Sequence, residues 1–226
     1  MILLQASTAI DSAAAAAATA EGIHVIDLVM KGGWVMFPLG FLLFATIFLI
    51  IERWLAINSN GKIDDSFIDN IKDFIKQGNV KSAESLCRNQ KSAAGRVFEK
   101  AVGRIGYSIR DIESTVENAG QIEIARMESN IAYLGVIAGI APMLGFVGTI
   151  SGIINIFYSI SLSNDFNIST VASGMYEKMI TSGSGLIVGL IAYMGYHLLN
   201  MKLDRFALKM QASAFDFLDV LQKPVK

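Results

Sequence analysis

The sequence is poor in the residues that most soluble enzymes use for chemistry. It has one cysteine, Cys87, and two histidines, His24 and His197, in 226 residues. A lone cysteine cannot form an internal disulfide, and no metal-ligand spacing surrounds it, so we interpret Cys87 as a small buried apolar residue. The sequence has no Ser/His/Asp set and no glycine-rich phosphate-binding loop. It therefore predicts neither an enzyme nor a cofactor.

Charged residues are also scarce. They make up 17% of the chain, whereas 53% is hydrophobic and the mean hydropathy is +0.47. A soluble domain usually carries about 25% charged residues, so this composition is typical of a membrane protein. The net charge is −1, and no basic stripe alternates with aromatic residues. The sequence therefore gives no electrostatic reason to expect nucleic-acid binding.

Three long stretches carry no charge at all: residues 32–51, 129–164 and 179–201. A helix needs about 20 apolar residues to cross the hydrocarbon core, so each stretch can span a membrane. The second would be roughly 54 Å long as one helix, so it should project beyond the bilayer. The third span is expected to begin near Ser169. We predict an all-α membrane protein with three transmembrane helices and long cytoplasmic helical extensions.

The basic residues predict the orientation. Most of the 19 Lys and Arg lie within 53–126 and 202–226, whereas only Lys31 precedes the first span and the loop at 161–170 has none. Basic residues collect on the cytoplasmic side, so the N-terminus is expected outside and the C-terminus inside.

The chain is expected to divide into seven segments. They are an outside (periplasmic) tail with a short interfacial helix (1–31), transmembrane helix 1 (32–56), a cytoplasmic helical region (57–128), transmembrane helix 2 (129–161), an outside loop (162–168), transmembrane helix 3 (169–201) and a cytoplasmic C-terminal helix (202–226). Apolar residues recur at helical spacing in the cytoplasmic region, with a break at 77–79. We expect a small helical bundle there, followed by one long helix from Ile109 into the second span.

Small residues recur along the second and third spans. Glycine lets helices approach closely in a membrane, and the candidate packing residues are Gly135, Gly139, Gly145, Gly148, Gly152, Gly185 and Gly189. Pro142 should kink the second span or free a carbonyl, which is tolerable only where protein or water satisfies it. The hydroxyl groups in these helices can also have a purely structural role, because Ser and Thr often donate a hydrogen bond to the backbone carbonyl four residues earlier.

The third span carries a carboxylate well inside its helical length. At ~100° per residue, Thr170, Ser173, Thr181 and Ser184 lie within about 40° of Glu177 and form a polar stripe with it. A charged group in hydrocarbon costs at least a few kcal/mol, so Glu177 should face protein or water. One interpretation is an ion path, with the proton as the transported ion. The other is a structural hydrogen-bond network between helices, and the stripe alone leaves both open.

Two runs resemble the signature segments of a known family. The second-span run APMLGFVGTISGI and the third-span run GMYEKMITSGSGLIVGLIA are similar to those of the MotA/TolQ/ExbB proton-channel family, in its ExbB/TolQ branch. The KGGW before the first span, the ERW after it and the cytoplasmic SAESLCRNQKSAAGRVFEKAV also fit. By motif position, Glu177 matches the family's pore glutamate and Thr149 its second-span threonine. Ser182 stands where the family has a third-span threonine, whereas helical geometry places Thr181 and Ser184 beside Glu177. Lys178 departs from the small residue that is usual in the branch.

This resemblance implies a homopentameric ring in the bacterial inner membrane. Its second and third spans would line a pore around an ExbD/TolR-like single-span partner. Protons passing through the pore would drive work on a TonB- or Tol-type protein that spans the periplasm. A TolQ-like role in envelope maintenance, a motility-type motor and a non-conducting membrane scaffold remain as alternatives. The flagellar stator branch fits poorly, because it normally has four spans and lacks the third-span glutamate.

Overall fold

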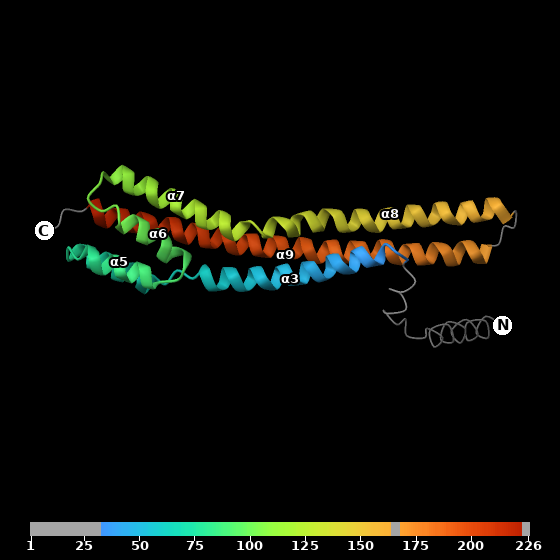
Figure 1. Cartoon of the computed structure of the whole chain (residues 1–226), viewed down its shortest axis with the longest axis horizontal. Coiled ribbons are helices and arrows are strands. Elements are labelled where there is room, and N and C mark those ends of the chain that lie inside the picture. Colours follow the sequence, from blue (N-terminus) through green and yellow to red (C-terminus); the bar gives the residue numbers. More distant parts are fainter. Residues whose placement is uncertain (1–32, 164–167, 223–226) are drawn as a thin grey trace, which may run out of the picture. The chain divides into compact units, whose positions relative to one another are not determined.

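The computed structural model describes residues 33–163 and 168–222, and these residues are helical almost throughout (Figure 1). In chain order the helices are α3 (Met36–Asn60), α4 (Asp65–Lys76), α5 (Val80–Asn89), α6 (Ala93–Val102), α7 (Ile109–Glu128), α8 (Ile131–Ser163) and α9 (Ile168–Gln222). In this part of the chain, the only β-type contact is an isolated bridge between Ile105 and Tyr107. The expected tail and interfacial helix at 1–31, with His24, and most of the loop at 162–168 lie outside the described residues.

Three stretches of the described chain are long and apolar enough to cross a membrane: Met36–Lys76, Ile109–Leu162 and Val171–Gln222. The protein is therefore an all-helical membrane protein with three candidate spans. Helix α9 is 55 residues long, which corresponds to about 80 Å at ~1.5 Å per residue and exceeds any bilayer. It continues without a break past residue 201, where the third uncharged stretch ends.

The segment from Ile109 onward differs in one detail from the prediction of a single helix. Helix α7 ends at Glu128 and α8 begins at Ile131. Ser129 keeps right-handed helical angles, with φ −49° and ψ −41°, and its backbone N–H still donates to the Ala125 carbonyl oxygen. The interruption at residues 129–130 is therefore a local loosening where the polar and apolar parts of the chain meet.

Short polar side chains set the starts of helices α4 to α7. Asp64, Asn79, Ser92 and Ser108 each accept a hydrogen bond from a backbone N–H in the first turn of α4, α5, α6 and α7. Such caps satisfy donors that have no partner within the helix. The predicted break at 77–79 separates α4 from α5, and Gly78 takes a positive φ of 72° there. Glycine adopts this conformation without the steric cost that a Cβ would add.

Close contacts divide the chain into two compact units, Met1–Phe41 with Ala141–Ile187 and Leu42–Ile140 with Val188–Lys226. The core of the second unit is built around aromatic rings. Phe98 is fully buried, and its ring centroid lies 6.5 Å from that of Phe67 and 5.4 Å from that of Phe217, edge to face in both pairs. Burying each phenylalanine contributes about 1.5–3 kcal/mol, so these rings hold α4, α6 and the C-terminal part of α9 together.

Cys87 belongs to the same core and is 1% exposed, which confirms its interpretation as a buried apolar residue. Burial, with smaller contributions from Glu99 and Glu84, raises the pKa of its thiol to about 12. The thiolate is the reactive form of cysteine, so this residue is chemically inert in the folded protein.

One buried ion-pair network joins α6 to α7. Glu123 is 5% exposed, and its carboxylate accepts from Arg96 Nη2 at 2.6 Å and from Arg126 Nη1 at 3.0 Å. The hydrogen bond from Arg96 is the largest cause that lowers the pKa of Glu123. Two guanidinium groups thus compensate one carboxylate in a place where an unpaired charge would be costly.

Candidate functional site

The candidate site lies in the first compact unit, where α8 and α9 touch through glycines. A Cβ built on Gly185 would lie 2.7 Å from the Ala141 carbonyl oxygen and 2.9 Å from the Gly145 Cα. A Cβ on Gly145 would in turn lie 3.1 Å from the carbonyl oxygens of Thr181 and Ser182. Backbone therefore meets backbone at this point, as in the close helix contacts that small residues permit in membranes.

Thr181 lies inside this contact. Its side chain is fully buried, and a Cβ on Gly148 would lie 2.8 Å from its Cγ2. Its hydroxyl group donates to the Glu177 carbonyl oxygen at 3.4 Å. Val35, which is 5% exposed, also lies against Gly148. Thr181 thus packs between the two helices and contacts the backbone of Glu177.

Thr149 connects α8 to α9 with a hydrogen bond. Its Oγ1 lies 3.0 Å from the Lys178 carbonyl oxygen and 3.2 Å from the Gly145 carbonyl oxygen, so two acceptors share one proton. The first of these bonds crosses between the helices and fixes α8 at the residue that follows Glu177. Thr149 therefore lies beside the residue that follows Glu177.

Glu177 itself is half-buried on α9. Among residues 33–163 and 168–222, no ion pair or hydrogen bond to its carboxylate is found within the usual distances. The contacts that surround it involve its backbone and its neighbours along the helix. Its carboxylate is consequently available to water, to another copy of the chain or to a different protein.

Lys178 occupies a notch that the sequence did not reveal. Its side-chain methylenes lie over Gly152 of α8, where they fill the position that a Cβ would take. Its Nζ lies 3.8 Å from the position of a Cβ on Gly33. The lysine stem thus packs against α8 with its ammonium group beside the residues that precede α3. The sequence alone could not predict this contact. It pairs a glycine of α8 with a lysine of α9, and the register of the two helices must be known to find it.

The remaining predicted residues have mixed surroundings. Ser184 donates to the Ile180 carbonyl oxygen at 2.9 Å, and Ser182 is half-buried. With Thr149 and Thr181, this gives three hydroxyls that bond a carbonyl four residues earlier, the structural alternative foreseen from the sequence. The assignment of these hydroxyls to a proton path therefore stays a prediction.

The predicted packing residues also differ from one another. Gly148, Gly152 and Gly189 are buried, and a Cβ on Gly135 would lie 3.3 Å from the Tyr196 ring. Gly139 is exposed and has nothing within 4 Å of such a Cβ. Any packing through Gly139 would need another chain.

Helix α8 runs through Pro142 without interruption.

In the same described residues, no three His, Cys, Asp or Glu side chains gather as a metal site would require.

The chain is similar in sequence to a known family and to several known proteins. The model of the MotA/TolQ/ExbB proton channel family matches residues 89–212, more than half of the chain. "Putative biopolymer transport protein ExbB-like 1" of Synechocystis is 26% identical over 191 residues, which cover 81% of this chain and 75% of that protein. "Tol-Pal system protein TolQ" of Pseudomonas aeruginosa is 22% identical over 188 residues, covering 78% and 81%. The chain therefore belongs to the MotA/TolQ/ExbB proton channel family, whose members are membrane channels and not enzymes.

Proposed function

We propose that the chain is the channel subunit of an inner-membrane motor that converts proton-motive force into work on a TonB- or Tol-type partner. In this proposal several copies, five by resemblance to the family, form a ring whose wall consists of the second and third spans. A single-span protein of the ExbD/TolR kind lies inside the ring. The N-terminus faces the periplasm and the C-terminus the cytoplasm, as the distribution of Lys and Arg favours.

The observation that carries the proposal is the state of Glu177. It is a half-buried carboxylate on an apolar spanning helix, and no cation or donor in the described chain compensates it. An intramembrane carboxylate without a partner is expensive, and such residues usually mark ion or proton pathways. If Glu177 only held helices together, its carboxylate would be expected to accept hydrogen bonds from residues of the same chain.

The glycine contact and the Thr149 hydrogen bond suit a rigid channel wall. They hold the backbone from Lys178 to Gly185, directly after Glu177, so the Glu177 side chain can move while its position along the pore does not. Glu177 would take up a proton from the periplasmic side and pass it to a carboxylate of the single-span partner. The hydroxyls of Thr149 and Ser182 keep oxygen lone pairs that can accept hydrogen bonds from water in this path.

The test replaces Glu177 with Gln, which keeps the shape and removes the charge. Proton flux into proteoliposomes that contain this chain and its partner should fall to the background level. The copy number by native mass spectrometry should stay unchanged. Glu128→Gln is the matched control, because Glu128 is an exposed carboxylate at the end of α7, before the uncharged stretch that begins at residue 129.

Two results would contradict the proposal. Wild-type proton flux in Glu177→Gln would exclude Glu177 from the proton path. A Glu177→Ala variant that loses its oligomeric state, together with a Gln variant that behaves like wild type in every assay, would support the non-conducting scaffold instead.

A further inference from the structure

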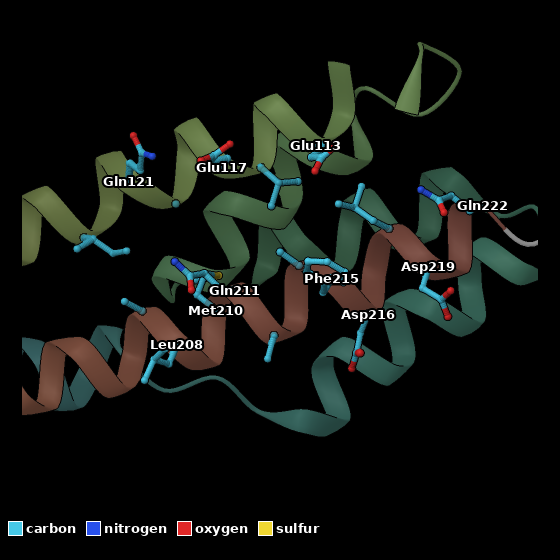
Figure 2. Close-up of a pocket in the computed structure, with 17 residues that line it drawn as sticks. Glu113, Glu117, Gln121, Leu208, Met210, Gln211, Phe215, Asp216, Asp219 and Gln222 are labelled. Atoms are coloured by element: carbon cyan, nitrogen blue, oxygen red, sulfur yellow. The ribbon is translucent and has the colours of Figure 1, made fainter. Parts of the chain in front are cut away.

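A groove of about 830 Å³ runs between α7 and the C-terminal part of α9, far along the chain from Glu177. Figure 2 shows Glu113, Glu117 and Gln121 on α7 and Gln211, Phe215 and Asp219 on α9 along it. All of its residues belong to the second compact unit. The proposed channel gives this groove no role.

The groove combines an apolar interior with an acidic rim. Val116 and Met210 are buried along it, whereas Leu208 is 66% exposed and Phe215 is 79% exposed. Its carboxylates are Glu113, Glu117, Asp216 and Asp219; Asp216 pairs with Lys72 at 3.3 Å, and no lysine or arginine is among the lining residues in the described chain. Large exposed apolar side chains with a charged rim are typical of a protein-binding surface. The charge requires a basic partner.

A basic surface of this kind exists on the chain itself. Residues 80–104, which form α5, α6 and the following turn, contain six basic and two acidic residues. The exposed cations of this basic surface are Lys81, Arg88, Lys91, Lys100 and Arg104. Part of this charge is already compensated, because Arg88 pairs with Glu99 at 3.7 Å. Lys91 and Lys100 form no ion pair within 4 Å in the described residues.

The internal contacts place the basic surface behind the groove and at the same level. Arg96 of α6 pairs with Glu123 of α7, and Phe98 of α6 packs on Phe217 of α9. Glu123 and Phe217 are both buried, and neither lines the groove. Helix α6 therefore covers the sides of α7 and α9 that point away from the groove.

In a ring, rotation about the membrane normal leaves the height of every residue unchanged. The back of one copy then meets the front of the next at the same height, as in any heterologous cyclic interface. We propose that the acidic groove binds the basic α5–α6 surface of the neighbouring copy. This inference rests on the proposed homo-oligomer and names the contact that closes it on the cytoplasmic side.

The test is a charge swap in the full-length protein, purified in nanodiscs. Glu113→Lys with Glu117→Lys should raise the ring's dissociation constant about tenfold at low salt, and so should Lys91→Glu with Lys100→Glu. All four substitutions together should restore most of the affinity. The control is Glu128→Lys with Asp204→Lys, which makes the same change in charge at exposed residues of α7 and α9 outside the groove.

A cross-link gives a second measurement. Copies with Glu117→Cys and copies with Lys100→Cys, carrying different tags, should form a disulfide-linked heterodimer under mild oxidation. Asn118→Cys, one residue further along α7 and not part of the groove, should not. The native Cys87 can stay in place because it is buried.

The outcomes separate this inference from the proposed function. A monomeric wild type would overturn the ring and the groove contact together. An oligomeric wild type whose groove variants match the control would overturn only the groove contact. Groove variants that weaken the ring without rescue by the four-fold swap would show that another surface occupies the groove.

Discussion

The contact between α8 and α9 makes a graded prediction about glycine-to-alanine substitutions. At Gly185 the added Cβ would meet backbone atoms, the Ala141 carbonyl oxygen at 2.7 Å and the Gly145 Cα at 2.9 Å. Backbone cannot rotate away, so the helices must separate. We expect Gly185→Ala to cost about 3 kcal/mol, at the upper end of the usual range for overpacking.

At Gly152 the nearest atoms to the added Cβ would be the methylenes of Lys178. A flexible stem can move at a cost of about 1 kcal/mol, so Gly152→Ala should be milder. At Gly139 nothing lies within 4 Å of the added atom, and alanine is the better helix former by about 0.8–1 kcal/mol. Gly139→Ala should therefore be neutral or stabilising in a single chain.

The assay is thermal unfolding of the three variants in the same detergent. For a chain of this size, 1 kcal/mol changes the Tm by about 2–4 °C, so Gly185→Ala should lower the Tm by roughly 6–12 °C and Gly152→Ala by about 2–4 °C. Adding Lys178→Ala should rescue Gly152→Ala and leave Gly185→Ala unchanged, because only the first clash involves the lysine. Equal Tm values for Gly185→Ala and Gly139→Ala would refute the backbone contact.

Four further predictions concern single residues. Thr149→Val should lower the free energy of unfolding, measured by chemical denaturation, by about 1 kcal/mol. Thr149→Ser should lower it by much less, because serine keeps the hydrogen bond to the Lys178 carbonyl oxygen. Equal losses in the two variants would exclude that bond. The pKa of Glu123 is lowered from 4.5 in the folded state, so its stabilising effect is present above pH 4.5 and is lost as the pH falls through the folded pKa. The acid-induced loss of helical circular dichroism should therefore be less steep in Glu123→Gln than in the wild type. Arg96→Met should cost about 3–5 kcal/mol because it leaves that carboxylate buried with one partner fewer, and a loss below 1 kcal/mol would contradict the network. Cys87, whose pKa is raised to about 12, should resist alkylation at pH 8 until denaturant unfolds the protein, as mass spectrometry can show.

Local rules predicted much of the helical architecture. Uncharged stretches located three apolar helices, and the break at 77–79 separates the short helices α4 and α5. These features depend on neighbouring residues along the chain, so periodicity and turn chemistry are sufficient to find them. The pairing of Arg96 with Glu123 could not be found in this way, because it joins residues on different helices whose register only packing determines.

The residues next to Glu177 show, for single side chains, why packing cannot be predicted from the sequence. Helical geometry favoured Thr181, four residues on, and the family resemblance favoured Ser182. In the structure Thr181 is fully buried and its hydroxyl contacts the Glu177 backbone carbonyl, whereas Ser182 is half-buried. A helical wheel gives the angle between two residues but not which side of the helix a second helix covers. Because α8 covers the side of α9 that carries Thr181, this residue packs between the two helices although it is close to Glu177 in angle, whereas Ser182 is less buried.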